Sequence, residues 1–523
     1  MKRVLTVLIV LLIVPGLVLN AEEKVKTIKG SQIASVKGSV RSWDDAVKTM
    51  MGRKGQVTKM KPVLNFENPR QITLPADTHD PVAQTPADMS RSTKAISGVS
   101  GFAGMTFSAN GAGWPPDTCG DVGPSHYVQA VNTSIGIYNK STGAKISSST
   151  FDAFFQGSGI TGTPCDEDNN GDPIVLYDWY AQRWFILDFA WNSTHSNGFW
   201  FSIAVSQSSD PTGSWYQYAF QADATYMNDY PKAGVWEDGI YITANMFNYS
   251  TGAFQGVKVW ALKKPDLYNG TLTSLSIFDN SWQAWSILPS NAKGTTAPTT
   301  GDPCYMFALD ASEYGSPSID AIYWWKADVN WTANTFTWTG PYTMTTAAFG
   351  LTATGIKQKC GATLDSLYGR LMHSAIYRKF ATYGSVYLCH VVEGSSRRLM
   401  RWYEIRINSG TCSINQQSTF SPTTDTYSRW MGSIGGDKDG KIAMGYSTGN
   451  NKLNAAIRVL DCVGASETNV KSAGGCQYTY TRWGDYSYMT IDPSDDKTFW
   501  YTHEYMAANG TNWQTWICKF QVN

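Results

Sequence analysis

The sequence predicts an all-β fold, a single seven-bladed β-propeller that follows an N-terminal extended linker. Three observations lead to this prediction. A short motif that runs into an alternating strand recurs along the chain, the turns between strands are rich in Asp and Gly, and helical periodicity is nearly absent. In addition, 16% of the 523 residues are charged while 21 are Trp and 28 are Tyr, which excludes a coiled coil, a helical bundle or a disordered chain.

The recurring motif begins with Gly, Asn or Arg. It occurs at Gly120–Gly123, Gly171–Ile174, Asn228–Pro231, Gly301–Cys304, Gly369–Met372, Arg429–Gly432 and Arg482–Asp485. Most copies are followed by a second strand, and turns such as Glu237-Asp238-Gly239 are typical of β-hairpins. The copies start roughly 50 to 70 residues apart, which fits one four-stranded blade with its loops. Six or eight blades, and two β-sandwiches in tandem, remain alternatives.

Residues 1–21 have the pattern of a secretory signal peptide. Lys2 and Arg3 precede the apolar run Val4–Val14, and Ala21 supplies a small residue for cleavage. We therefore expect a secreted protein, extracellular or at the cell surface, with no membrane span after cleavage. The alternative is an uncleaved N-terminal anchor.

Residues 22–96 differ in composition from the rest of the chain. Prolines are spaced through polar and basic residues, and Trp43 is the one Trp in this stretch. This predicts a linker or pro-segment, in which Ser42 would cap a short helix over residues 43–51. Residues 97–523 form the predicted propeller domain.

The cysteines and the net charge limit the functional classes. Nine Cys are scattered singly, without the paired spacing of a zinc site, so disulfides are expected with at least one thiol left over. Cys462 and Cys476 flank a polar loop and are the predicted bridge. Lys plus Arg and Asp plus Glu are both 42, so the net charge is zero and nothing indicates nucleic-acid binding.

Four segments carry a resemblance to a known family: Pro115–Pro124, Asp172–Asp178, Asp229–Trp236 and Arg482–Ser487. They resemble a family of secreted bacterial β-propeller proteins that is largely uncharacterised. The resemblance implies secretion and the propeller, and it supplies no reaction. A weaker likeness is to sialidase-type propellers, because Ser208–Trp215 is similar to an Asp-box with one extra residue before its Gly.

A candidate site follows if the seven motifs are innermost strands, because their starts would then meet at one end of the central channel. This predicts a ring that contains Asp121, Asp172, Asp229, Asp302, Arg370, Arg429, Arg482 and Asp485. The three arginines would grip a carboxylate or sulfate, since each guanidinium can donate two parallel hydrogen bonds. The alternative is that these Arg and Asp residues pair with one another between blades.

The ring also offers catalytic groups. Sialidases use an arginine triad, and propeller-type polysaccharide lyases neutralise a uronate with Arg before a His or Tyr takes the proton. By the same chemistry Asp229 or Asp485 is a predicted acid/base, with His373 or Tyr486 as the proton-transfer partner. Stacking platforms for sugar rings are predicted at Trp236, Trp430 and Trp483, with burial between blades as the alternative for each.

A calcium loop is the sharpest local motif. Oxygen ligands at alternate positions, with a Gly for the turn, match the first half of such a loop at Asp166, Asp168, Asn170 and Asp172. Tyr177 stands where an EF-hand has its bidentate Glu, so the motif predicts a structural Ca²⁺ between strands and no EF-hand. The alternative is an exposed turn rich in Asp and Asn.

Two functional hypotheses follow. The first is an enzyme, a glycoside hydrolase or polysaccharide lyase that acts on an acidic extracellular polysaccharide at the channel mouth. The second is a non-catalytic surface or matrix protein that binds glycan or a protein partner. We expect a monomer in either case. The spelling Gly445-Tyr446-Ser447-Thr448-Gly449 matches a nucleophile elbow but lacks its strand-turn-helix setting, and it predicts the end of a blade strand instead.

Overall fold

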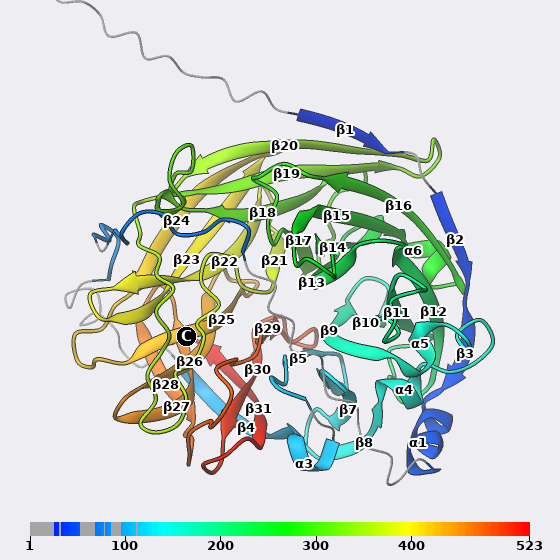
Figure 1. Ribbon diagram of the computed structural model, residues 1–523, viewed down its shortest axis with the longest axis horizontal. Coiled ribbons are helices and arrows are strands. Elements are labelled where there is room, and N and C mark those ends of the chain that lie inside the picture. The colour runs from blue at the N-terminus through cyan, green and yellow to red at the C-terminus, as the bar shows by residue number, and fades with distance from the viewer. Residues whose placement is uncertain (1–25, 31–32, 53–67, 78, 85–95, 111–112) are drawn as a thin grey trace, which may run out of the picture.

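The computed structural model describes residues 26–30, 33–52, 68–77, 79–84, 96–110 and 113–523. These residues are almost entirely β, and their sheets are arranged like blades around a common axis (Figure 1). The predicted β-propeller is therefore confirmed. The predicted signal peptide lies outside the described residues. Within the described part of the chain, no helix is long and apolar enough to cross a membrane.

Each blade is a meander of four antiparallel strands. The first blade consists of β5 (Cys119–Val122), β6 (His126–Val131), β7 (Ser134–Asn139) and β8 (Lys145–Thr150). The second consists of β9 (Asn169–Asp178), β10 (Arg183–Ala190), β11 (Phe199–Ser206) and β12 (Ser214–Asp223). The third consists of β13 (Met227–Val235), β14 (Gly239–Phe247), β15 (Phe254–Lys263) and β16 (Thr271–Asp279). Short helices lie in the connections: α3 (Phe107–Asn110), α4 (Phe151–Phe154), α5 (Pro164–Glu167), α6 (Lys264–Leu267) and the 3-10 turn Ser312–Tyr314.

The next two meanders share one sheet, because their innermost strands β17 and β21 pair in parallel. The remaining strands are β17 (Leu288–Lys293), β18 (Cys304–Asp310), β19 (Ala321–Asn330) and β20 (Thr335–Thr345); β21 (Ala375–Lys379), β22 (Gly384–Gly394), β23 (Arg397–Asn408) and β24 (Thr411–Phe420); β25 (Ser428–Gly436), β26 (Ile442–Asn450), β27 (Leu453–Asp461) and β28 (Ser466–Lys471); and β29 (Tyr488–Ile491), β30 (Phe499–Met506) and β31 (Trp513–Val522).

The innermost strands form a closed ring. Around the axis each contacts the next, in the order β5, β9, β13, β17, β21, β25, β29 and back to β5. The ring is closed by β4 (Ile96–Thr106), which pairs with β31 at the end of the chain and completes the last meander. Joining the two ends in one sheet leaves no free edge at the seam. The blade number itself is retained as a prediction.

One blade departs from the predicted pattern. The motif at Gly301–Cys304 leads into β18, the second strand of its blade, and the innermost strand there is β17, whose sequence Leu-Pro-Ser-Asn-Ala-Lys lacks the motif. Asp302 consequently lies in the loop after β17, at the opposite end of the ring, where it is exposed and its Oδ2 lies 3.8 Å from Nζ of Lys379. It is excluded from the predicted ring of site residues.

Parts of residues 22–96 are built into the propeller. The strands β1 (Lys26–Gly30), β2 (Ile33–Lys37) and β3 (Ser39–Ser42) pair with β20, β16 and β12, which are the outer strands of three blades. The predicted helix is present as α1 (Trp43–Gly52), where the Ser42 hydroxyl accepts a hydrogen bond from the Asp45 N–H at 3.1 Å. These strands cover the outer sheet edges, as Figure 1 shows for β1 at the top of the ring and for β2 and β3 on its right side.

The blades pack through Trp residues buried between neighbouring sheets. Trp184, on β10, is fully buried, and its ring lies against Gly123, where an added Cβ would come within 2.6 Å of the indole. The Gly that ends the motif in the first blade is thus explained by the Trp of the next blade. Many of the Trp residues are buried in this way, so packing between blades explains much of the high aromatic content.

Candidate functional site

Three carboxylates meet at the end of the ring where the innermost strands begin. Asp117 precedes β5, Asp172 lies near the start of β9, and Asp485 precedes β29. One carboxylate oxygen from each lies within 4.8 Å of the others, and all three side chains are buried. Because the three residues belong to three different meanders, the closure of the ring brings them together, and their positions in the sequence alone do not.

Hydrogen bonds hold this carboxylate cluster (Asp117, Asp172 and Asp485) in place. The side-chain amide of Asn132 donates to Oδ2 of Asp117 at 2.6 Å, and its Oδ1 accepts the N–H of Asp172 at 2.8 Å. The N–H of Asp485 donates to Oδ1 of Asp117 at 2.6 Å. Asp117 and Asp172 have positive φ values of 48° and 52°, a conformation that non-glycine residues rarely adopt and that is often found at functional sites.

Basic and aromatic groups surround the cluster. Arg482 forms an ion pair with Asp485, and the Tyr486 hydroxyl donates to Oδ2 of Asp172 at 3.2 Å. Lys232 is buried over the rings of Tyr230 and Tyr486, which stack on each other. Burial lowers the pKa of Lys232 well below its ordinary value, while the nearby carboxylates of Asp172 and Asp485 act in the opposite direction.

Arg370 stands beside this group and differs from the other two predicted arginines. Its guanidinium lies 5.0 Å from the ring centre of Tyr230 and 5.2 Å from that of Trp285. The residue is half-buried, and within the described residues its Nε has no hydrogen-bond acceptor and its guanidinium no carboxylate partner. The Tyr230 hydroxyl and the Trp285 indole N–H are also buried donors without a partner there.

The predicted proton-transfer residues are close but deeply placed. His373 is 2% exposed, and its ring packs against Tyr486 and Tyr488. Burial, together with the neighbouring Lys232, holds the pKa of His373 well below its ordinary value. Asp229 is half-buried on β13, near enough to influence Lys232 but outside the carboxylate cluster.

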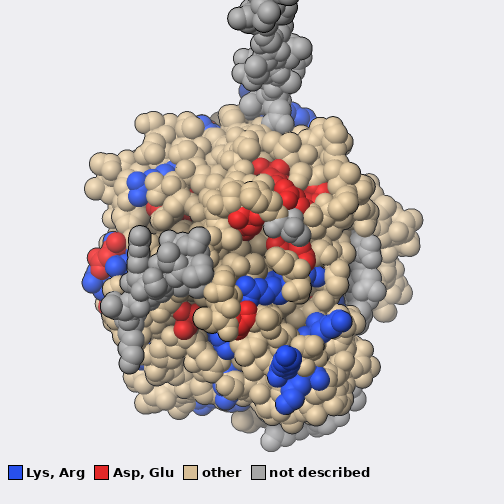
Figure 2. Space-filling model, turned by 90° about the vertical axis from the view of Figure 1, so that its left-hand side faces the viewer, with Lys and Arg blue, Asp and Glu red and all other residues tan. Residues whose placement is uncertain are grey.

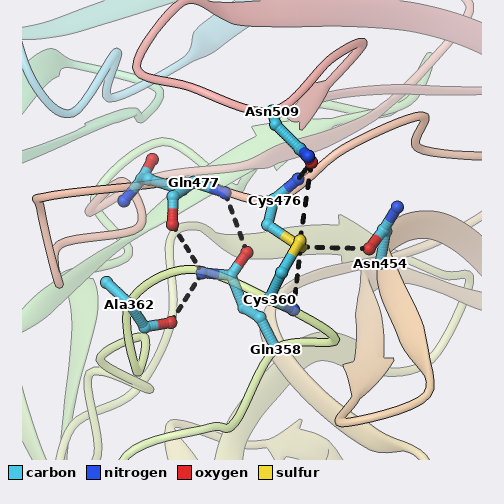
Figure 3. Close-up of a disulfide and its surroundings, with 7 residues drawn as sticks. All are labelled: Gln358, Cys360, Ala362, Asn454, Cys476, Gln477 and Asn509. Carbon is cyan, nitrogen blue, oxygen red and sulfur yellow. Dashed lines mark hydrogen bonds between the residues drawn. A yellow bond between two sulfur atoms is a disulfide. The ribbon is translucent and has the colours of Figure 1, made fainter.

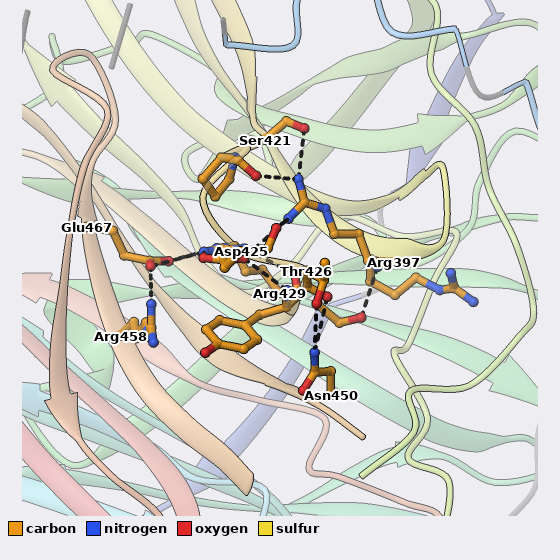
Figure 4. A network of polar contacts seen from close by, with 12 residues as sticks. Arg397, Ser421, Asp425, Thr426, Arg429, Asn450, Arg458 and Glu467 are labelled. Atoms are coloured by element: carbon orange, nitrogen blue, oxygen red, sulfur yellow. Dashed lines mark hydrogen bonds and ion pairs between the residues drawn. The ribbon is translucent and has the colours of Figure 1, made fainter. Parts of the chain in front are cut away.

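Arg429 is not part of the site. Its side chain is fully buried inside its own blade, where Nε donates to Glu467 at 2.7 Å and Nη2 to Asp425 at 2.8 Å (Figure 4). Arg397 and Arg458 pair with the same two carboxylates. The predicted arginine triad is therefore wrong. Arg429 and Arg482 do pair with carboxylates, but with Asp425, Glu467 and Asp485 nearby in their own segments of the chain and not between blades as the alternative had it.

The predicted sugar platforms are core residues. Trp236, Trp430 and Trp483 are at most 1% exposed, so no sugar ring can stack on them. Trp236 donates to the carbonyl of Asp302 at 2.9 Å, and Trp483 donates to the Ser447 hydroxyl at 2.9 Å. Asp121 is likewise buried deeper along the axis, in an ion pair with Lys293 at 2.5 Å.

The predicted calcium ligands do not converge. Asp172 belongs to the carboxylate cluster, whereas Asp166 lies in the short helix α5 and Asp168 just after it. The Asn170 amide donates to the carbonyls of Asp168 and Trp191. The alternating spacing is split between a helix and a bulged strand, so these four residues do not form a calcium loop.

A disulfide fastens two loops at the same end of the ring. Cys360, in the loop between β20 and β21, bonds to Cys476, in the loop between β28 and β29 (Figure 3). The predicted Cys462–Cys476 bridge is wrong, since Cys462 is a buried free thiol. The first loop carries Arg370 and His373 and the second carries Arg482 and Asp485, so the disulfide ties together both segments of the site.

The segment Gly445–Gly449, which is spelled like a nucleophile elbow, places Ser447 next to His503. Oγ of Ser447 lies 2.7 Å from Nε2 of His503, but both side chains are fully buried and Ser447 is within β26. The pair therefore stabilises contact between two blades and is not accessible to a substrate. The prediction of a blade strand is confirmed.

The predicted site residues did not include Asp117, Lys232 or Glu504, a buried residue of β30. The Tyr230–Lys232 segment carried a signal, because Asp172 and Tyr230 both precede a Pro and both have positive φ, 52° and 54°. The two residues are structurally equivalent, and the predicted alignment, which matched Asp172 with Asp229, was displaced by one position.

Comparisons with known proteins show distant structural similarity. No protein-family model and no curated protein matches the chain. It is similar to a protein of unknown function from Dyadobacter fermentans DSM 18053, at 11% identity and a TM-score of 0.35 over 67% of this chain and 94% of that chain. It is also similar to extracellular domains 1–2 of Drosophila semaphorin 1a, at 9% identity and a TM-score of 0.37 over 81% of this chain and 88% of that chain. A third similarity is to Trypanosoma rangeli sialidase, at 11% identity and a TM-score of 0.31 over 81% of this chain and 59% of that chain.

Proposed function

We propose that this protein binds an anionic group of an extracellular polysaccharide, a uronate carboxylate or a sulfate, at the end of the ring where the innermost strands begin. Arg370 is the residue that would hold the anion. The observation that carries this proposal is the contrast among the three predicted arginines: Arg429 and Arg482 have carboxylate partners, and Arg370 has aromatic neighbours instead.

Three unpaired donors gather at Arg370. Its Nε, the Tyr230 hydroxyl and the Trp285 indole N–H are buried without hydrogen-bond partners among the described residues. Leaving a buried donor unpaired costs roughly 1–3 kcal/mol, so such groups indicate an acceptor that arrives from outside. The two rings hold the guanidinium in one place while its exposed part stays accessible, which favours bidentate binding of a carboxylate or sulfate.

The polysaccharide part of the proposal rests on location. The Cys360–Cys476 disulfide is typical of an oxidising compartment, in agreement with the predicted signal peptide. On the side shown in Figure 2 the surface is mostly uncharged, with small groups of both signs. The chain as a whole has a formal net charge of zero, so a general electrostatic attraction for polyanions is not expected and recognition would depend on the local donors around Arg370.

A lyase is the second candidate, favoured by the unpaired Tyr230 hydroxyl beside Arg370. Arg370 would neutralise a uronate carboxylate, and His373, which burial keeps neutral by lowering its pKa, would take the proton α to it. The electron pair would form the new C=C bond as the glycosidic bond breaks, and the Tyr230 hydroxyl, whose pKa burial raises, would give its proton to the leaving oxygen. Tyr230 replaces Tyr486 in this role, because the Tyr486 hydroxyl already donates to Asp172.

The test compares binding to uronate, sulfated and sialylated glycans by the wild type, Arg370→Ala and Arg370→Lys. We expect Arg370→Ala to weaken binding about tenfold or more, and Arg370→Lys to keep part of the affinity. Arg183→Ala is the matched control, since Arg183 is a half-buried Arg that follows the turn after β9, at the other end of the ring. Equal binding by wild type and folded Arg370→Ala would overturn the proposal, and release of unsaturated products would identify a lyase.

A further inference from the structure

We propose that Asp117, Asp172 and Asp485 bind a hard divalent cation, Ca²⁺ or Mg²⁺, on the axis of the propeller. Calcium ions take carboxylate oxygens at about 2.3–2.6 Å, so oxygens on opposite sides of one ion lie about 5 Å apart. One oxygen from each Asp lies within 4.8 Å of the others, a separation that a single ion spans without rearrangement of the backbone.

Glu504 is a second observation that points to a ligand. It lies on β30, is 1% exposed, and neither of its carboxyl oxygens has a hydrogen-bond partner among the described residues. Its Oε1 is directed at the turn that carries Asp485, because a Cβ added to Gly484 would lie 2.8 Å from it. Burying a carboxyl group without a partner costs folding free energy, and a cation beside the cluster would be a partner for it.

The charges around the site also leave room for a divalent ion. Four carboxyl groups, those of Asp117, Asp172, Asp485 and Glu504, face two basic groups, Arg482 and Lys232. If all six are ionised the net charge is −2, which one divalent cation neutralises.

Hard oxygen ligands select the kind of metal. No His or Cys takes part in the cluster, which disfavours Zn²⁺ and other borderline or soft ions. The site is distinct from the calcium loop that the sequence predicted, and it shares Asp172 with that loop. It adjoins the anion site but uses different side chains, since Arg370 contacts Tyr230 and Trp285.

The experiment measures bound metal in the full-length protein. After dialysis against EDTA, calcium or magnesium chloride is titrated by calorimetry, bound metal is quantified by mass spectrometry, and the melting temperature is followed. We expect one equivalent of ion with an increase in melting temperature. Asp485→Asn and Glu504→Gln should weaken binding about tenfold or more, whereas the control Asp166→Asn/Asp168→Asn should bind as the wild type does.

The outcomes separate this proposal from the others. Absence of a bound ion and of a thermal shift in the wild type would overturn it, and so would loss of the ion in Asp166→Asn/Asp168→Asn. If Asp485→Asn does not fold, the stoichiometry of the wild type and of the Asp166→Asn/Asp168→Asn control still decides. Arg370→Ala should retain the ion, so failure of glycan binding and failure of metal binding are distinguishable.

Discussion

Arg429 donates from Nε to Oε1 of Glu467 at 2.7 Å, although Arg429 stands at the start of the innermost strand β25 and Glu467 lies on the outermost strand β28 of the same blade. The bond is possible because the Arg429 side chain runs along the blade and away from the axis. β25 has a bulge between Trp430 and Ser433, where Met431 has a positive φ of 53°. Arg429 precedes that bulge and so belongs to the blade, not to the channel mouth.

Arg429→Ala should therefore destabilise the fold and leave anion binding intact. The change removes the buried partner of the half-buried Asp425 and Glu467, which keep Arg397 and Arg458, so the loss should be at most the roughly 3–5 kcal/mol of a fully buried ion pair. Urea unfolding of the variant, compared with Arg183→Ala, measures the loss. A weakened glycan affinity at unchanged stability would contradict this assignment.

Removal of the disulfide should loosen the site. Cys360 and Cys476 are 116 residues apart in the chain, and closing a loop of this size typically contributes about 2–4 kcal/mol. We expect Cys360→Ser/Cys476→Ser to melt at a lower temperature and to bind the anionic glycan more weakly. Non-reducing peptide mapping should recover Cys360 linked to Cys476 and Cys462 as a free thiol; a Cys462–Cys476 peptide would show the structure to be wrong.

Two buried histidines should make the protein sensitive to mild acid. Burial lowers the pKa of His503 to about 3, and burial together with Arg401 lowers that of His390 to about 3. An unfolded His titrates near 6.5, so the unfolded chain takes up protons first as the pH falls. Stability should be highest above about pH 6.5 and should decrease, by an amount on the order of a few kcal/mol, as the pH falls toward 3.

The measurement for this prediction is the free energy of unfolding between pH 7 and pH 4. His390→Gln should flatten its pH dependence, because Gln does not titrate and retains a polar group near the Tyr403 hydroxyl, which lies 2.9 Å from His390 Nε2. His79→Gln, a change at an exposed residue, is the control and should leave the profile as in the wild type. Identical slopes for wild type and His390→Gln would refute the assignment.

Gly123→Ala should destabilise the contact between the first two blades. The added Cβ would lie 2.6 Å from the Trp184 ring, and overpacking of a buried contact costs about 1–3 kcal/mol. Gly213→Ala is the matched control, because the nearest atom to its added Cβ is 3.4 Å away. Thermal unfolding of both variants checks the prediction, and equal melting temperatures would argue against this blade contact.

The sequence by itself determined the propeller and many of its strands. The β14 strand begins at Gly239, at the end of the predicted turn Glu237-Asp238-Gly239, because alternating apolar residues and Asp-Gly turns are local signals that need no tertiary information. The helix over Trp43 and the convergence of Asp172, Asp485, Arg370 and Arg482 near one end of the ring also followed from the repeats.

Only the tertiary structure decided which side chains face the axis. Neighbouring residues in a strand point to opposite faces. The predicted alignment was displaced by one position, so it placed Asp229 in the site where the structure has Tyr230. The bulge in β25 turned Arg429 into its blade in the same way. The Cys360–Cys476 bond, the carboxylate cluster and Glu504 depend on ring closure, which brings residues hundreds of positions apart into contact and leaves no local trace in the sequence.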